Sequence, residues 1–462
     1  MIDIIIITSY LLITLLIGLY AGKSMKGFTD FAVGGRNYGS WIILATLSAS
    51  FMGGGYTFGI SEKVFRYGIP YIICLLGFSL QQIIVAILVA PKMGRFKDAL
   101  SVGDIMDTLY GKSGRLISGF ASVLVCIGIV GAQVNATGYV FDLFLGIDRV
   151  VGIWLGCGIV IVYSMIGGMR SVVATDILQF GVLIIAIPMG LAFGISYVGG
   201  FEAIVQSVPK LHLEVPGSMA IPTILSLFLS LLLGETLVPP YVQRLFIAKN
   251  TKETKRGILW SGLLSIPFFI TAGCIGLVAL TMNTSLDPDH AMPHVLEAAL
   301  PAGLRGIAVA GVIAVIMSSA DSYLNAASVA VVQDIVSPLR EISSKAKLHL
   351  ARVSTLFIGL GAIFFALTIE SVLDILLYSY NFWAPVVLVP MVGGILNYKV
   401  SPKAFVMCVI SGILGVCFWN LFFQQATGLD GLVIGALTNG ICFFLFVVRG
   451  KRRMTREKFA TG

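Results

Sequence analysis

Charged residues are scarce in this sequence. Only 12% of its 462 residues are Asp, Glu, Lys or Arg, whereas 57% are hydrophobic. Soluble domains carry about 25% charged residues because their surface faces water, so a soluble fold is excluded. Apolar runs of about 20 residues follow one another along the chain and predict an all-α, multi-pass protein of the lipid bilayer. In such a protein the formal charge of +8 reports topology and indicates no nucleic-acid partner.

Patterns for metal binding, disulfides and catalysis are also missing. The seven cysteines lie inside apolar runs without metal-type spacing, and the four histidines do not cluster. No Ser/His pair, HExxH motif or paired carboxylate arrangement shares a helical face. We therefore expect no enzyme and no cofactor.

Apolar runs separated by charged or Gly/Pro-rich breaks predict about 13 membrane helices. The first run, residues 2–20, has no basic residue before it and is long enough to span, so we interpret it as a membrane helix and not as a signal peptide. We refer to it as the leading helix and number the others 1 to 12. The predicted helices begin near residues 2, 41, 69, 116, 150, 173, 219, 256, 303, 351, 372, 402 and 430.

The positions of the basic residues support this count. If the N-terminus lies outside, the segments on the cytoplasmic side hold 26 of the 31 Lys and Arg residues. One helix more or fewer would exchange inside and outside for the rest of the chain. The positive-inside rule thus predicts an odd number of helices in the cell membrane, with the N-terminus outside and the C-terminus cytoplasmic.

Two predicted helices are interrupted at membrane depth. Helix 1 holds three consecutive glycines at 53–55, and helix 6 holds Gly234 and Glu235 shortly before Pro239 and Pro240. Glycine weakens a helix and proline removes a backbone donor. Within a membrane, free backbone polar groups persist where they line a cavity or are buried in protein. Breaks at matching positions of two five-helix sets indicate a five-plus-five inverted repeat with a midplane site.

We therefore expect a single transmembrane domain over residues 1–450 and a short basic cytoplasmic tail over 451–462. The domain would comprise a leading helix at 1–21, a first repeat at about 41–197, a second repeat at about 219–398 and extra helices at about 402–450.

Three carboxylates, those of Asp176, Glu235 and Asp321, fall within the apolar segments. Ionisable groups at membrane depth are costly and are functional candidates by default. We expect no Lys or Arg at comparable depth, so a bound cation is the expected partner. The alternative is that one or more are protonated or lie near a boundary, Asp176 above all.

Helix 8 carries a polar stripe. Ser318, Asp321, Ser322 and Asn325 are three or four residues apart and share one helical face. Hydroxyl, carboxylate and amide oxygens on one face predict a hydrophilic surface toward a cavity. Oxygen ligands are those that hard cations prefer, so sodium is the expected ion.

With these residues in view, the chain resembles the sodium:solute symporter family, which includes the sodium/proline, sodium/sugar and high-affinity choline transporters. The resemblance covers nearly the whole chain. It implies the inverted-repeat fold known as LeuT-like. The stretches that carry it are residues 167–179, Tyr241-Val242-Gln243-Arg244 with Ala248-Lys249, and Met317-Ser318-Ser319-Ala320-Asp321-Ser322.

Carried over residue by residue, the resemblance implies a sodium site where helices 1 and 8 meet. Its ligands would be the carbonyls of Ala49, Met52 and Val315 and the hydroxyls of Ser318 and Ser319. Asp176 matches an aspartate that such proteins place beneath that site, linked to ion exit or to a second sodium. Some relatives have hydroxyls where Asp321 stands, so a second site with Asp321 and Ser322 is left open to sodium, a proton or nothing.

The glycines of helix 1 and the Ser-Ser-Ala-Asp-Ser sequence look most like the choline-transporter branch. Choline recognition needs aromatic faces, yet Met52, Ile129 and Val238 stand where that branch has tryptophans, so we do not predict choline. An ionised Glu235 would favour an amine or amino-acid-like cation, whereas a protonated one leaves a carboxylate or a neutral solute equally open. The candidate substrate residues are Tyr56, Gln133, Asn135, Glu235, Tyr380, Asn381 and Trp383.

The sequence thus predicts a sodium-coupled symporter that imports a small polar organic solute by alternating access. The alternatives are an ion channel or leak protein and a transporter-like sensor. We find no pore-loop repeat or filter motif that would favour a channel. The sequence ends shortly after the last predicted helix, so we expect no signalling domain.

Overall fold

The computed structural model describes residues 1–368, 378–398 and 400–460. Apart from an isolated bridge between Tyr38 and Ala248, the regular structure of these residues is helical. The short helices are α2 (Phe28–Val33), α8 (Phe201–Ser207), α9 (Lys210–Leu213), α13 (Ala291–Ala299), α17 (Val389–Ile395) and α19 (Gln424–Thr427). The others are α1 (Ile2–Gly22), α3 (Ser40–Phe51), α4 (Gly54–Tyr67), α5 (Ile69–Ile84), α6 (Val102–Leu145), α7 (Arg149–Tyr197), α10 (Ile221–Gly234), α11 (Pro239–Ile247), α12 (Thr251–Met282), α14 (Leu304–Ala330), α15 (Ser344–Thr368), α18 (Pro402–Phe422) and α20 (Gly431–Ala460).

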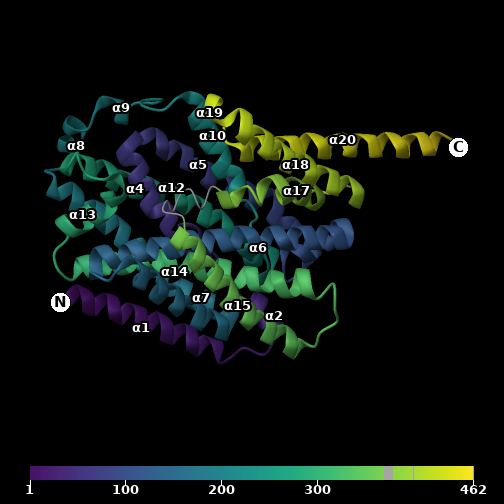
Figure 1. Ribbon diagram of the computed structural model, residues 1–462, viewed down its shortest axis with the longest axis horizontal. Helices are drawn as coiled ribbons and strands as arrows, with labels where there is room; N and C mark the ends of the chain where they lie inside the picture. Colours follow the sequence, from purple (N-terminus) through teal and green to yellow (C-terminus); the bar gives the residue numbers. More distant parts are fainter. Residues whose placement is uncertain (369–377, 399, 461–462) are drawn as a thin grey trace.

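Helix α14 lies in the centre of the bundle. Its most apolar stretch is 94% buried, compared with 22% for α1 and 28% for α18. It packs chiefly against α6 and α7, and Figure 1 shows these helices side by side in the lower half of the view. Because α14 is enclosed all round, its polar side chains face other protein groups and not lipid.

Nine helices of the described residues are long and apolar enough to span a membrane, and counting two bent pairs as one span each gives eleven. The bent pairs are α3 with α4, at 53°, and α10 with α11, at 48°. They are the two helices in which the sequence predicts breaks.

The 49-residue helix α7 accounts for two predicted spans. Tyr163 and Thr175 both donate hydrogen bonds to Asp321 Oδ2, at 2.7 and 3.3 Å. A straight helix would hold residues twelve apart about 18 Å from each other, so the chain reverses between them. The reversal is at Gly168, whose φ of 52° is left-handed and where a Cβ would lie 2.6 Å from the Phe31 carbonyl oxygen.

The remaining difference from the predicted count concerns the segment expected to begin near residue 372. That start lies outside the described residues. Its later part is present as a π-helical turn, Ala384–Leu388, followed by α17.

Loops that the charge pattern places on one side of the membrane meet at one end of the bundle. At the other end, Asp3 at the start of α1 pairs with Arg305 at the start of α14, at 2.7 Å. Figure 1 places the N-terminus, α8, α9 and α13 together at the left of the view. The basic loops are joined by contacts of Arg36 with Lys97 and Ala99, of Arg95 with Ile395, of Lys249 with Tyr38 and of Lys347 with the Phe28 ring. The basic segment expected as a tail from residue 451 continues α20 through Ala460.

Candidate sodium and substrate sites

The break between α3 and α4 lies directly against α14. Ser319 Oγ donates to the Ser50 carbonyl at 2.7 Å and to the Val315 carbonyl at 3.2 Å. A Cβ on Gly53 would lie 2.1 Å from Ser319 Oγ, so the absence of a side chain at Gly53 permits this approach. Backbone oxygens of the broken helix and a hydroxyl of α14 are thereby brought together.

The five residues expected to bind sodium are all buried at this junction. The Met52 carbonyl is not used by the helix ladder and accepts from Thr57 Oγ1 at 3.0 Å. Ser318 Oγ donates to Asp176. The donor set consists of carbonyl and hydroxyl oxygens, which suits a hard cation such as sodium. The buried set is Ala49, Met52, Val315, Ser318 and Ser319.

The environment of Asp176 contradicts one expectation. The sequence analysis places no Lys or Arg at the depth of the carboxylates, yet Arg244 is fully buried and its Nη2 lies 3.3 Å from Asp176 Oδ2. Thr46 also donates to this carboxylate. The nine residues of α11 are all buried because the bend after α10 directs this short helix into the bundle. Asp176 is therefore buried in protein, and the guanidinium of Arg244 balances its charge.

Asp321 differs from Asp176 because no ion pair of the described residues includes it. Besides Tyr163 and Thr175, it accepts from Ser322 Oγ at 3.1 Å. Ser322 in turn accepts from Arg244 and lies 2.9 Å from Ser50 Oγ. Asp176 and Asp321 thus belong to one buried network of hydrogen bonds that reaches the predicted sodium ligands.

A second cluster surrounds Glu235 at the break between α10 and α11. Tyr380 Oη donates to Glu235 Oε1 at 2.6 Å and lies 3.0 Å from Tyr56 Oη. Tyr323 Oη approaches the same carboxylate oxygen at 3.5 Å. All four side chains are at most 5% exposed. The structure therefore joins three of the predicted substrate residues into one group.

The other predicted substrate residues have different positions. Gln133 faces the first break, since its Nε2 would lie 3.6 Å from a Cβ on Gly53. Trp383 is buried and donates from its ring nitrogen to the Thr236 carbonyl at 2.9 Å. Asn135 is buried, and Arg149 at the start of α7 donates to its Oδ1 at 2.7 Å. Asn381 follows Tyr380 in the sequence and is half-buried.

Sequence reasoning missed Ser50, Arg244 and Tyr323. The position of Tyr323, two residues after Asp321 on α14, carries a signal, because a helix buried all round presents every side chain to protein. Arg244 gives no such signal, since a basic residue after a helix break reads as a loop anchor.

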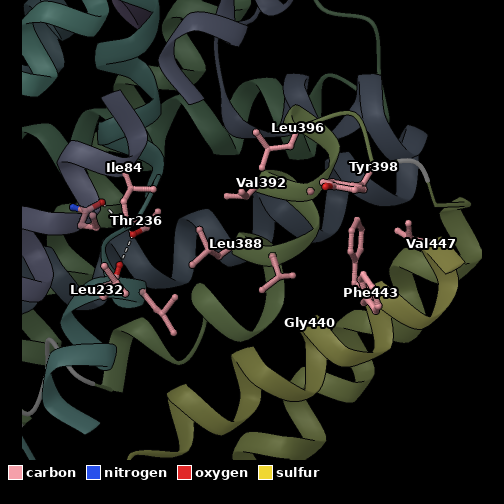
Figure 2. A pocket seen from close by; sticks show the side chains of 15 residues that line it. Ile84, Leu232, Thr236, Leu388, Val392, Leu396, Tyr398, Gly440, Phe443 and Val447 are labelled. Atoms are coloured by element: carbon pink, nitrogen blue, oxygen red, sulfur yellow. Dashed lines mark hydrogen bonds between the residues drawn. The ribbon is translucent and has the colours of Figure 1, made fainter. Parts of the chain in front are cut away.

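An apolar groove of about 510 Å³ lies on a different face of the α10 break, between α5, α10, α17 and α20. Figure 2 shows Ile84, Leu388, Val392 and Phe443 along its walls. Thr236, next to Glu235, borders it and donates to Gln81 Oε1 at 3.1 Å. Glu235 does not line this groove. Because the walls of the groove suit an apolar molecule, we do not place a polar solute there.

Membrane-spanning helices, two of them broken and lined with buried polar groups at the breaks, define a secondary transporter of the inverted-repeat class. The chain belongs to the sodium:solute symporter family, whose pattern matches residues 31–412. It is therefore a multi-pass membrane protein of a transporter family and not an enzyme, as expected from its sequence.

Known proteins show the same relationship. The chain is 23% identical to the osmoregulated proline transporter OpuE of Bacillus subtilis, over 96% of this chain and 94% of that protein. It is 25% identical to the human high affinity choline transporter 1, over 79% and 68% of the two chains. Its fold is similar to that of a Na⁺-coupled sialic acid symporter in a substrate-bound outward-open state, with a TM-score of 0.85, 21% identity and coverage of 97% and 98%. This similarity confirms the LeuT-like fold, while the relatives' different solutes mean that family membership assigns no substrate.

Proposed function

We propose that the protein imports a small polar organic solute together with sodium by alternating access. The observation that carries this proposal is the junction of the α3–α4 break with Ser319, where carbonyl and hydroxyl oxygens converge beside a helix interruption. Sodium bound there would tie α3 to α14. Each ligand moves the equilibrium between outward and inward states only by its differential affinity for them.

The solute would occupy the space next to Glu235, between the two breaks. Solute binding would favour occlusion, and a low internal sodium concentration would empty the ion site after the bundle opens inward. We assign Asp321 and Ser322, with Asp176, to a second ion or a proton. Because Arg244 already balances Asp176, the carboxylate with unmatched charge in this network is that of Asp321.

The protein would act in the cell membrane as one transport domain over residues 1–450, with repeats at about 41–197 and 219–398. Its basic end would face the cytoplasm, which places the N-terminus outside and the C-terminus inside.

The test compares purified wild type with Ser319→Ala, using thermal stability in sodium and in potassium chloride and uptake into proteoliposomes. Ser319→Ala removes one sodium ligand, so we expect the sodium concentration for half-maximal stabilisation to rise about tenfold, the effect of 1.4 kcal/mol. Ser328→Ala is the matched control, because Ser328 is buried in the same helix and bonds back to Leu324 and Asn325.

The sodium concentration for half-maximal stabilisation of the control Ser328→Ala should equal that of wild type. A wild type that sodium stabilises no better than potassium, and that shows no sodium-stimulated uptake of any solute in a broad panel, would refute symport. Equal sodium dependence in Ser319→Ala and Ser328→Ala would refute this position of the ion.

A further inference from the structure

Glu235 is a buried carboxylate without a protein counter-charge. Its side chain is 3% exposed, and none of the ion pairs among the described residues includes it. Its Oε2 has no hydrogen-bond partner within that part of the chain. Asp176, at similar burial, has Arg244. A buried charge is costly unless it is paired, so an ionised Glu235 requires a partner that the protein does not provide.

One further buried oxygen beside a break lacks a hydrogen-bond donor. Gln133 Oε1, beside the first break, has no partner among the described residues. The half-helix that follows Glu235 begins with Pro239 and Pro240, which carry no N–H. Free N–H groups are what make a helix N-terminus attractive to anions. This end is therefore poorly suited to a carboxylate, whereas the orphan oxygens suit a molecule that donates hydrogen bonds.

Aromatic rings pack against the tyrosines of the Glu235 cluster. Tyr56 lies 5.4 Å from Phe78 and 5.9 Å from Phe269, centre to centre. On the α14 side, the Phe51 ring is 5.4 Å from that of Tyr241 and 6.0 Å from that of Tyr323. Ring faces attract cations, and they cover alkyl groups at the same time. A bare metal ion would instead be surrounded by oxygens.

We propose that the co-transported solute carries a positively charged, alkyl-substituted nitrogen that pairs with Glu235 inside this aromatic wall. The proposal rests on the symport function above and names its substrate class. Tyr380 holds Oε1 of the carboxylate, which leaves Oε2 for the ammonium. This aromatic wall differs from the tryptophan arrangement of the choline branch, because its members next to Glu235 are the tyrosines Tyr56, Tyr323 and Tyr380.

The experiment measures thermal stabilisation by a panel of solutes in sodium and in potassium chloride. The cationic set is methylammonium, tetramethylammonium, choline and putrescine, the neutral set is glucose and urea, and the anionic set is pyruvate and acetate. We expect stabilisation by at least one cation, in sodium only. Sodium-dependent stabilisation by glucose, urea, pyruvate or acetate, with none by the cations, would overturn the substrate class and leave symport intact. Absence of any sodium-dependent effect would count against symport itself.

Variants of the carboxylate provide the second measurement. Glu235→Gln should weaken the cation at least about tenfold while stabilisation by sodium alone persists, because one charge-assisted contact is lost. If that variant does not fold, Tyr380→Phe, which keeps the ring but frees Oε1, should weaken binding about threefold. The matched control is Glu62→Gln on α4, whose carboxylate is already paired with Lys63 and Arg66. Wild-type cation affinity in Glu235→Gln, or in Tyr380→Phe where Glu235→Gln does not fold, would overturn the assignment.

Discussion

Arg244 and Asp176 form an ion pair in which neither side chain is exposed. Such a pair contributes little net stability, since removing two charges from water costs about as much as their attraction returns. The pair constrains the structure in another way, because removing either charge alone would leave the other one buried and unpaired. Because Asp176 also accepts from Ser318, the pair fixes the orientation of a proposed sodium ligand.

Replacing one partner of this pair should be far more harmful than replacing both. We expect Arg244→Met to lower the free energy of unfolding by about 3–5 kcal/mol, because it leaves Asp176 uncompensated. The double variant Arg244→Met/Asp176→Asn should recover much of that loss. Thermal or denaturant unfolding in detergent measures both, and a double variant as unstable as the summed single variants would show that the charges are not coupled.

Gly53 permits the contact between the first broken helix and α14. Gly53→Ala would place a methyl group 2.1 Å from Ser319 Oγ, and overpacking of this kind costs about 1–3 kcal/mol. Adding Ser319→Ala should restore part of the stability, because it removes the clashing oxygen. Gly181→Ala in α7 is the control: nothing lies within 4 Å of its Cβ, so the melting temperature should stay or rise. If Gly53→Ala melts like Gly181→Ala, the two elements are not in close contact.

Single residues differ in how well the sequence predicts them. Ser318, Asp321 and Ser322 follow from the spacing of polar residues on one helix, which is regular there, whereas Ser319 follows from the family resemblance alone. The positions of Arg244 and Tyr323 depend on the tilt of the short helix α11 and on which helices pack together, and both are features of the tertiary structure. Asn135, two positions from Gln133, also depends on tertiary packing, since its Oδ1 accepts a hydrogen bond from Arg149 of another helix.

At the scale of helices, the breaks are predictable because their cause is local. Consecutive glycines weaken a helix and paired prolines remove two of its backbone donors, whatever their tertiary surroundings. The reversal of α7 at Gly168 is equally local. The lateral order of the helices cannot be predicted in this way, because apolar faces of similar composition can pack in many ways.

A buried aspartate joins two of these helices at the basic end. Asp334, in the π-helical turn after α14, accepts from Ser101 Oγ and from the Gly103 N–H at 3.3 Å. Ser101 is the N-cap of α6 and accepts from the Asp104 N–H. Asp334 thereby satisfies groups that an isolated helix start leaves free.

Asp334→Ala should therefore loosen the start of α6 and cost about 1–3 kcal/mol, the penalty of unsatisfied buried groups. Hydrogen exchange of the amides at 102–105 should accelerate while exchange in the middle of α6 does not change. Asp107→Ala is the control, since the Asp107 side chain is 40% exposed and exposed ion pairs such as that with Arg115 contribute about 0–1 kcal/mol. Equal exchange in both variants would contradict the capping role.

At the scale of the molecule, the loops sort into two ends that differ in charge. The contacts of Arg36, Arg95, Lys249 and Lys347 hold the basic loops together. A sequence-based count of helices was needed to assign these loops to one side, and an error of one helix would have divided them. Their contact in the folded chain is therefore an independent check on the parity of the count.

The direction of insertion follows from the same asymmetry, because cytoplasmic loops carry the excess of Lys and Arg. We expect a membrane-impermeant maleimide to label Ser285→Cys from outside the cell and Lys345→Cys from the cytoplasmic face alone. Both positions are exposed and lie at opposite ends of the bundle, Ser285 in the loop after α12 and Lys345 in the first turn of α15. All seven native cysteines are replaced by alanine first, since Cys417 is exposed. Labelling of position 345 in intact cells would reverse the topology, and with it the assignment of the sodium-loading side, whereas labelling of both positions from outside would break the parity of the helix count.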